Sequence, residues 1–211
     1  MPRLVVFDMD GVLADIESSW VFVHQRFGVN NDNSLYAYLR GEIDDLEFIR
    51  RDIALWRAKD PEVDEVKIAR ILDDVPLMQG ARETVKGLHA KGYRTAIVSA
   101  GIDLLAERIS RECGIDLHLA NGLDKLPSGQ LTGEGILNVR LMDKGEAVVK
   151  AAHSLGIRLE DTASVGNSRY DVTMFERTGT SIAFHPSDDY ARSHAKFVVE
   201  EGDLTMLLRY L

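Results

Sequence analysis

The chain has few of the residues that would commit it to several common protein classes. It contains one cysteine, Cys113, so no disulfide can form within the chain and no cysteine-based zinc cluster can be built. Its six histidines show no close pairing of the kind that binds a metal. No apolar run approaches the length that is needed to cross a membrane. These deficits argue against a disulfide-stapled domain, a zinc protein and a membrane-spanning protein.

Positive charge is also scarce, because 25 Lys and Arg residues stand against 34 Asp and Glu, which gives a net charge of −9. This balance argues against nucleic acid or an anionic membrane as the main partner, but it leaves a small anionic substrate open. Residues 1–3 run directly into an apolar segment and do not resemble a signal peptide. We therefore expect a cytoplasmic protein with a small-molecule partner.

Strand-like apolar runs alternate with amphipathic segments along most of the 211 residues, which are enough for one good core and a smaller lobe. This alternation predicts an α/β fold, with a Rossmann-like parallel sheet and helices on both faces. A Pro-Ser-Gly turn in residues 121–137 predicts an additional hairpin. The expected strands are 4–7, 94–98, 117–120, 162–165, 181–184 and 197–199, and the expected helices are 83–91, 103–113, 144–155, 170–178 and 204–211.

One long segment interrupts the alternation, because no strand-like run occurs between about residues 15 and 74. Apolar residues recur there at helical spacing in three stripes, near residues 20–27, 46–56 and 68–72. We therefore expect a core of residues 1–14 and 76–211, with an inserted helical cap, residues 15–75, that acts as a lid. The cap aromatics Trp20 and Trp56 would serve a homodimer, the cap core or the binding pocket, and the sequence leaves all three open.

The most informative feature is the run Leu4-Val5-Val6-Phe7-Asp8-Met9-Asp10-Gly11, in which a buried strand delivers two carboxylates to its carboxyl end. Ligands of open α/β sheets bind beyond that end. Two acids so close to a core are costly because of desolvation and charge repulsion, unless they bind a cation or transfer a phosphoryl group. Asp8 could attack phosphorus, while Asp10 could protonate the leaving oxygen and then activate water.

Two other interpretations of this run were considered. A simple turn with a helix cap remains open. A calcium-binding loop fails, because its sixth position would be Leu13 instead of glycine and its twelfth Ser19 instead of glutamate.

Three later segments place polar groups at equivalent positions, where strands end or helices begin. The run Ser99-Ala100-Gly101 could bind a phosphate oxygen through its hydroxyl and amides at a helix start, or Ser99 could simply cap that helix. Lys144 opposes a helix dipole, which suits the neutralisation of a phosphoryl group, although a solvated surface lysine is the alternative. Asn167 and Asp171 offer hard oxygen ligands, or an Asx turn followed by a first-turn acid. Because the carboxyl ends of parallel strands share one edge, these groups can converge.

In these motifs the chain resembles the haloacid dehalogenase superfamily, and specifically its phosphoserine-phosphatase-like branch. The resemblance spans nearly the whole chain, with the helical insertion in the place of that branch's cap and residues 121–137 in the place of its extra hairpin. The matching motifs are Asp8-Met9-Asp10-Gly11, Ser99, Lys144 and Gly166-Asn167-Ser168-Arg169-Tyr170-Asp171.

The resemblance implies Mg²⁺-dependent hydrolysis of a phosphomonoester through an aspartyl-phosphate intermediate. Asp8 would be the nucleophile and Asp10 the general acid and base, with Ser99 and Lys144 holding phosphoryl oxygens. Mg²⁺ would be held by Asp8, by the Asp10 carbonyl and by the last motif, through Asn167 and Asp171. The chain departs from the family where Asn167 replaces an acid and where Tyr170 replaces a small polar residue, so we expect weaker metal binding or a shift of coordination toward Asp171.

The resemblance also implies phosphoserine as the leading substrate. Glu17 would hold its ammonium group, Arg51 (with Arg50 as the alternate) its carboxylate, and Ala100 and Gly101 its phosphate. Three alternatives stay open: another small ester such as phosphoglycolate, phosphoryl transfer to an alcohol such as homoserine, and a non-catalytic protein that binds phosphorylated ligands.

Overall fold

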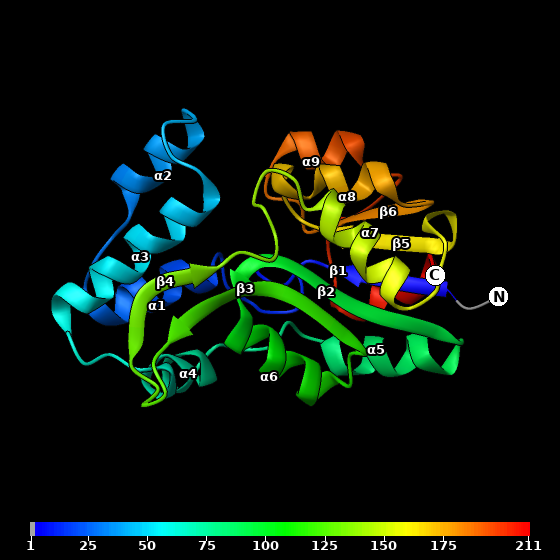
Figure 1. Ribbon diagram of the computed structural model, residues 1–211. Coiled ribbons are helices and arrows are strands. Elements are labelled where there is room, and N and C mark those ends of the chain that lie inside the picture. Colours follow the sequence, from blue (N-terminus) through cyan, green and yellow to red (C-terminus); the bar gives the residue numbers. More distant parts are fainter. Residues whose placement is uncertain (1–2) are drawn as a thin grey trace.

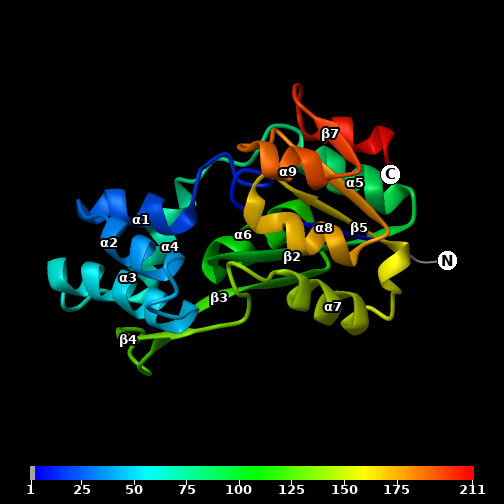
Figure 2. The same cartoon turned by 90° about the horizontal axis from the view of Figure 1, so that it is seen from above.

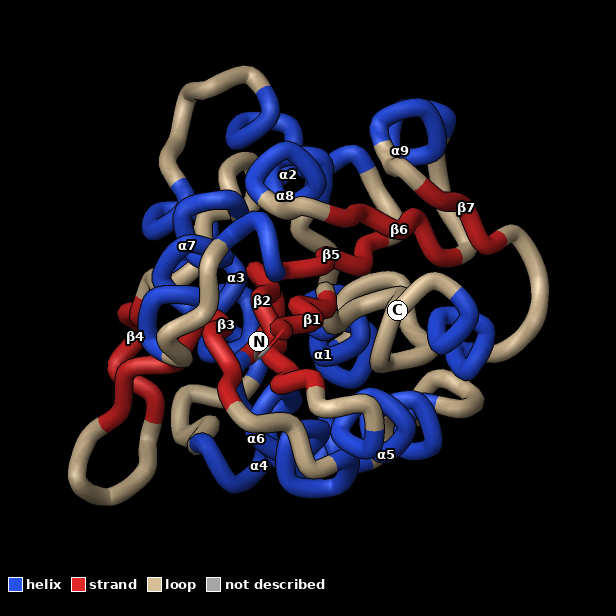
Figure 3. The backbone as a smooth tube through the Cα atoms, turned by 90° about the vertical axis from the view of Figure 1, so that its right-hand side faces the viewer, coloured by secondary structure: helices blue, strands red, loops and turns tan. Residues whose placement is uncertain are grey.

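The computed structural model describes residues 3–211 and is built around a seven-stranded sheet with the strand order β4-β3-β2-β1-β5-β6-β7 (Figures 1 and 3). All neighbouring strands are parallel except the β3–β4 pair, which is antiparallel. Residues 1 and 2 were expected to belong to the core and to lead directly into the first strand, but they lie outside the described residues. The predicted α/β fold with a Rossmann-like sheet is confirmed. The strands are β1 (Arg3–Phe7), β2 (Tyr93–Ile102), β3 (Leu117–Lys125), β4 (Leu131–Ile136), β5 (Thr162–Gly166), β6 (Thr180–Phe184) and β7 (Phe197–Val199).

Helices cover both faces of this sheet, as Figure 3 shows with α7 and α8 on one side and α5 and α6 on the other. Strand β1 is buried on both faces because its side chains alternate. Val5 and Phe7 join the hydrophobic cluster that includes α5 and α6, while Leu4 and Val6 join the cluster built on α7. No helix of residues 3–211 is both long and apolar enough to cross a membrane. The helices that flank the sheet are α5 (Ala81–Ala90), α6 (Asp103–Cys113), α7 (Gly145–Ser154), α8 (Val172–Arg177) and α9 (Asp189–His194).

Several element boundaries differ from those expected. Strand β2 continues to Ile102 instead of ending at residue 98, with an irregular register against β3 after Val98. The segment expected as a terminal helix is a 3₁₀ helix, Leu204–Arg209, and another 3₁₀ turn, Arg169–Asp171, precedes α8. Helix α9 was not predicted, because its six residues carry no apolar stripe. The hairpin expected in residues 121–137 is present as β3 and β4.

The inserted segment forms four helices, which Figures 1 and 2 show gathered at one end of the molecule beside the β3–β4 hairpin. They are α1 (Ser19–Phe27), α2 (Asp32–Leu39), α3 (Asp45–Lys59) and α4 (Glu65–Asp73). Three of them correspond to the predicted stripes. Helix α2 was missed because its apolar residues follow one another directly, without helical spacing. We call residues 15–75 the cap.

The chain enters and leaves the cap through two adjacent segments that are hydrogen-bonded to each other. The Asp15 amide donates to the Pro76 carbonyl at 2.9 Å, and the Met78 amide donates to the Leu13 carbonyl at 2.8 Å. Ala14 and Leu77 form an antiparallel bridge between these contacts. The cap is therefore joined to the sheet by a paired double crossing, directly after Asp8 and Asp10.

The cap packs around Trp56, which is fully buried and belongs to the same hydrophobic cluster as Phe7 of the sheet. The Trp56 ring stacks on Trp20 and Phe27 with centroid distances of 5.5 and 6.2 Å, and its indole Nε1–H donates to His24 Nδ1 at 2.7 Å. Of the three roles left open for the two tryptophans, Trp56 therefore serves the cap core. Trp20 lies between this core and the cavity described below.

Replacing Trp56 with phenylalanine should lower the free energy of unfolding by about 1–3 kcal/mol, because buried His24 loses its donor. Urea denaturation followed by circular dichroism would measure the change. Val66→Ala on the exposed face of α4 is the matched control and should leave the free energy of unfolding nearly unchanged. Equal stability of wild type and Trp56→Phe would contradict this account of the cap core.

Candidate active site

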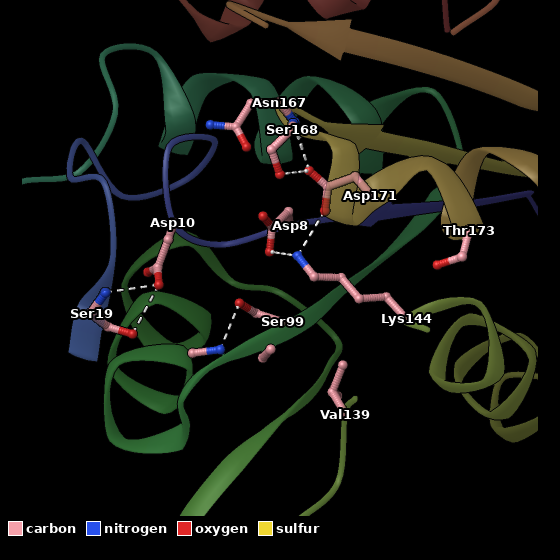
Figure 4. A network of polar contacts seen from close by, with 12 residues as sticks. Asp8, Asp10, Ser19, Ser99, Val139, Lys144, Asn167, Ser168, Asp171 and Thr173 are labelled. Carbon is pink, nitrogen blue, oxygen red and sulfur yellow. Dashed lines mark hydrogen bonds and ion pairs between the residues drawn. The ribbon is translucent and has the colours of Figure 1, made fainter. Parts of the chain in front are cut away.

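A cavity of about 550 Å³ lies between the carboxyl edge of the parallel strands and the cap. The core contributes Asp8 and Asp10 after β1, Ser99 from β2, and Lys144 at the start of α7. Figure 4 shows these side chains converging from separate segments of the core. The cap closes the opposite wall, with residues from α1, α2 and α3. The convergence that the sequence predicted from strand ends is thus observed.

The floor of the cavity is a buried chain of three charges. Lys144 Nζ lies 2.9 Å from Asp8 Oδ1 and 2.7 Å from Asp171 Oδ1 (Figure 4). Asp8, Lys144 and Asp171 are 4%, 3% and 0% exposed, so water screens these charges little. A solvated surface role for Lys144 is therefore wrong. The lysine is held between two carboxylates.

One lysine does not fully compensate two buried carboxylates. Burial raises the pKa of Asp8 to about 7, with the charge of Asp171 adding to the effect and Lys144 opposing it. Burial alone would lower the pKa of Lys144, but Asp171 and Asp8 outweigh it and raise that pKa above its ordinary value. A further positive charge beside Asp8 would therefore favour its ionised, nucleophilic form.

Asp171 is anchored on both of its oxygens. While Oδ1 pairs with Lys144, Oδ2 accepts hydrogen bonds from the backbone amides of Asn167 and Ser168 and from the Ser168 hydroxyl, at 2.9, 3.0 and 3.2 Å. Ser168 and Asp171 form a reciprocal capping box, which the Ser-x-x-Asp spacing could have revealed in the sequence. This placement favours Asp171 as an anchor of Lys144 and of the loop over the expected role of direct metal ligand.

Asp10 is oriented by Ser19, the first residue of helix α1 in the cap. Its Oδ2 accepts hydrogen bonds from the Ser19 amide and hydroxyl at 2.8 and 2.9 Å, and Ser19 Oγ in turn accepts from the Ile102 amide at 3.0 Å. Asp10 Oδ1 is buried without a hydrogen-bond partner. Burial raises the pKa of Asp10 to about 6, with the Ser19 hydrogen bonds opposing the effect. A carboxyl group in this state can donate or accept a proton near neutral pH.

The run Ser99-Ala100-Gly101 lines the cavity, but it does so from an extended strand and not from a helix start. Helix α6 begins only at Asp103 and has no side-chain cap, so a capping role for Ser99 is wrong. Ser99 Oγ accepts a hydrogen bond from the Gly101 amide at 3.1 Å, which already occupies that amide. Ser99 keeps its hydroxyl hydrogen available for a ligand in the cavity.

The Ala100 carbonyl is fixed from two sides. Asn121 Nδ2 donates to it at 3.1 Å, and the Trp20 indole of the cap donates to it at 3.0 Å. The pocket was one of the roles left open for Trp20, whereas Asn121 was missed, because its segment was expected only to form a hairpin. These contacts also tie the cap to the sheet.

The donor set beside Asp8 suits a hard divalent cation. Asp8 Oδ1 pairs with Lys144 but has no well-directed hydrogen bond, and Figure 4 shows the side-chain oxygen of Asn167 turned toward Asp8. Within residues 3–211 no group of three or more His, Cys, Asp and Glu is arranged to hold a metal. A cation here would depend on the Asp8 carboxylate and neutral oxygens such as those of Asn167 and the Asp10 backbone. Mg²⁺ accepts this kind of site because it retains several waters.

Two glycines permit this close arrangement. Gly11 adopts a φ of 76°, and a Cβ there would lie 2.0 Å from Asn167 Nδ2. A Cβ on Gly166 would lie 2.4 Å from the Cβ of Asp171. The loops that carry the carboxylates therefore approach each other more closely than any larger residue would allow.

The residues expected to bind the rest of the substrate are placed differently from one another. Glu17 lines the cavity. Arg51 is exposed and pairs with Glu47 at 2.9 Å, while Arg50 pairs with Glu134 at 2.5 Å, so the structure brings neither arginine into the cavity. The neighbouring residue of α3 that does reach the cavity is the acid Asp52.

The fold and this site together define an α/β protein with the cavity of an enzyme, in which a buried aspartate lies at the carboxyl edge of the parallel sheet. A model of the haloacid dehalogenase-like hydrolase family matches residues 5–176, and the chain belongs to this family. Its relatives place it in the phosphoserine-phosphatase-like branch, and it is a phosphatase.

Curated relatives and solved structures agree with this assignment. The chain is 30% identical to a phosphoserine phosphatase of Methanocaldococcus jannaschii over 99% of this chain and 97% of that protein. It is 29% identical to a phosphoserine phosphatase of Wolinella succinogenes over 99% and 100% of the two chains. A solved phospho-aspartyl intermediate analogue of phosphoserine phosphatase shares 29% identity with a TM-score of 0.81, covering 100% of this chain and 99% of that one. A substrate-bound phosphoserine phosphatase complex shares 28% identity with a TM-score of 0.83 and the same coverage.

Replacing Gly166 with alanine should lower the free energy of unfolding by about 1–3 kcal/mol, because the new methyl group would overlap Asp171 in a packed interior. Chemical denaturation would measure this loss. Gly87→Ala, inside α5, is the matched control, because a methyl group there would meet only the flexible end of the Leu208 side chain. That control should be neutral or slightly stabilising, and a similar loss in both variants would refute the argument.

Proposed function

We propose that this phosphatase hydrolyses small phosphomonoesters in a Mg²⁺-dependent reaction through an aspartyl-phosphate on Asp8. The observation that carries the proposal is the buried Asp8 carboxylate, 2.9 Å from Lys144 at the floor of a cavity that Asp10 also lines. A protein that only bound phosphorylated ligands would have no need of a buried nucleophile beside a second acid.

The first step forms one bond and breaks another. An Asp8 oxygen attacks phosphorus and the ester P–O bond breaks, while the protonated Asp10 gives its proton to the departing alcohol oxygen. Lys144 and the Ser99 hydroxyl lie at the cavity wall, where they can hold phosphoryl oxygens. In the second step Asp10 removes a proton from water, which attacks the phosphoaspartate, and inorganic phosphate leaves with Asp8 restored.

Asp8, the Asp10 carbonyl and Asn167 would hold the Mg²⁺ ion. When bound, the ion supplies positive charge that lets an anionic ester approach an anionic nucleophile and stabilises charge on the transferring phosphoryl group. Because Asn167 is neutral, we expect weaker metal binding than an acid at that position would give.

The cap, residues 15–75, acts as the lid in this proposal. Ser19 and Trp20 connect it to Asp10 and to the Ala100 carbonyl, so the closed position of the cap and the orientation of the acid are coupled. Closure excludes water and gathers the substrate against the sheet edge.

The substrate is expected to carry an ammonium group, because the Glu17 carboxylate of the cap lines the cavity and can pair with it. Phosphoserine is the first ester to measure, since several relatives are named phosphoserine phosphatases.

Replacing Asp8 with asparagine should reduce the turnover of an aryl phosphate at least about 1,000-fold, because the amide cannot form the phosphoenzyme. The fold should be retained, since the change is isosteric and removes one of two repelling carboxylates. Phosphate release and thermal unfolding would be measured together, with Asp189→Asn on the exposed helix α9 as control. A substantial remaining rate in Asp8→Asn would rule out the covalent route.

Removal of divalent metal should abolish turnover reversibly. After dialysis against a chelator, phosphate release from an aryl phosphate should fall to background and return when Mg²⁺ is added, while circular dichroism stays unchanged. Undiminished turnover after chelation would show that Lys144 alone supplies the necessary positive charge.

A further inference from the structure

We propose that the preferred substrates are phosphomonoesters of amino alcohols that carry no carboxylate, of which phosphoethanolamine is the simplest probe. This inference rests on the proposed function and narrows its substrate class. It comes from the distribution of charge around the cavity.

The phosphoryl end of the substrate is fixed by the core. Among residues 3–211, Lys144 is the one lysine or arginine that lines the cavity, and it lies against Asp8. The buried Oδ1 atoms of Asp8 and Asp10 lack well-directed hydrogen bonds. They are therefore available to the phosphoryl group and its cation at this end of the cavity. The remainder of any substrate must therefore extend toward the cap.

The cap presents carboxylates to that remainder and, within the described residues, no cationic side chain. Glu17 precedes α1, Asp45 begins α3, and Asp52 lies two turns further along α3. Arg50 and Arg51, which directly precede Asp52 on α3, pair instead with Glu134 and Glu47 and do not line the cavity. A positive group of the substrate is thus matched at this wall, whereas a negative group is not.

Asp52 is held so that it keeps a hydrogen-bond-accepting carboxylate at the wall. Asn31 Nδ2 donates to its two oxygens at 3.0 and 3.2 Å, and His24 Nε2 lies 3.5 Å from Oδ1. Because Trp56 donates to His24 Nδ1, the ring proton of a neutral His24 must be on Nε2, facing Asp52. Asp52 is 2% exposed, and both of its oxygens accept from Asn31, so its carboxyl group is fixed at the wall of the cavity.

Aromatic rings complete the same wall. Trp20 and Phe48 both line the cavity, and Trp20 is held in place by its stack on Trp56 and its hydrogen bond to the Ala100 carbonyl. Aromatic faces attract ammonium groups, and most strongly where water is excluded. Carboxylates and rings together favour a substrate whose positive charge lies opposite its phosphate.

A carboxylate on the substrate would be placed unfavourably. It would enter a cavity that already holds Asp8, Asp10, Glu17, Asp45 and Asp52 against Lys144, and it would meet no guanidinium or ammonium group at the cap. Phosphoserine therefore gains from its ammonium group and loses from its carboxylate. An ester with an uncharged alcohol part, such as β-glycerophosphate, has neither the favourable ammonium contact nor the unfavourable carboxylate contact.

The test compares kcat/KM of the intact protein with Mg²⁺ for phosphoethanolamine, phosphoserine and β-glycerophosphate. We expect phosphoethanolamine to exceed each of the other two by about tenfold or more, the size of one close charge contact at a binding site shielded from water. Phosphocholine, assayed in parallel, shows whether the aromatic wall accepts a quaternary ammonium.

Variants identify the residues responsible. Glu17→Gln and Asp52→Asn should each raise KM for phosphoethanolamine several-fold and leave the kcat/KM of β-glycerophosphate nearly unchanged. Glu62→Gln is the matched control, because this exposed acid of the cap lies outside the cavity and its side chain forms no ion pair within the described residues, so it should alter neither substrate. If Asp52→Asn is unstable, as judged by circular dichroism, Glu17→Gln alone keeps the test valid because Glu17 is exposed.

The outcomes separate the two proposals. Turnover of β-glycerophosphate or an aryl phosphate that depends on Asp8 and Mg²⁺, together with phosphoserine equal to or better than phosphoethanolamine, would overturn this inference and leave the proposed function intact. Equal losses for all substrates in Glu17→Gln and Asp52→Asn would also overturn it, because the acids would then act on the catalytic centre. Absence of turnover with every ester would overturn the proposed function itself.

Discussion

The buried ion chain Asp8–Lys144–Asp171 is the constraint on which the site depends. Three charged side chains with 4% exposure or less can coexist only when each has a partner, because an unpaired charge in this interior would be strongly destabilising. The sheet satisfies this requirement by bringing β1, the start of α7 and the loop after β5 to one edge. Gly166 leaves room for the Asp171 side chain, and the backbone amides of Asn167 and Ser168 donate hydrogen bonds to its second oxygen.

The same constraint explains why the Asp8 carboxylate is incompletely neutralised. Lys144 is shared between Asp8 and Asp171, so Asp8 receives only part of its charge, and burial keeps the Asp8 pKa raised. The neutral Asn167 adds an oxygen and no charge. In the proposed reaction a divalent cation would supply the remaining positive charge, while Lys144 holds Asp8 and Asp171 in place.

The cap contributes to both chemistry and selection. Ser19, at the first position of α1, orients Asp10, so the acid and the lid are parts of one hydrogen-bonded unit. On the opposite side of the cavity the cap supplies Asp52 and Glu17, and it directs its arginines outward. Core and cap thus line opposite walls of the cavity, with Asp8 at the sheet edge and Asp52 and Glu17 at the cap.

The sequence alone determined the parallel sheet, the inserted helical segment, and the identity of Asp8, Asp10, Ser99 and Lys144 as one convergent group. These predictions succeeded because strand ends of a parallel sheet share an edge, so order along the chain translates into proximity. Only the tertiary structure decided that Ser19 orients Asp10, that Asp171 is an anchor with both oxygens engaged, and that Asp52 faces the cavity where Arg51 was expected. These features depend on the rotation of α3 by about 100° per residue and on contacts between segments distant in the sequence. Of these contacts, local residue patterns indicate only the capping box between Ser168 and Asp171.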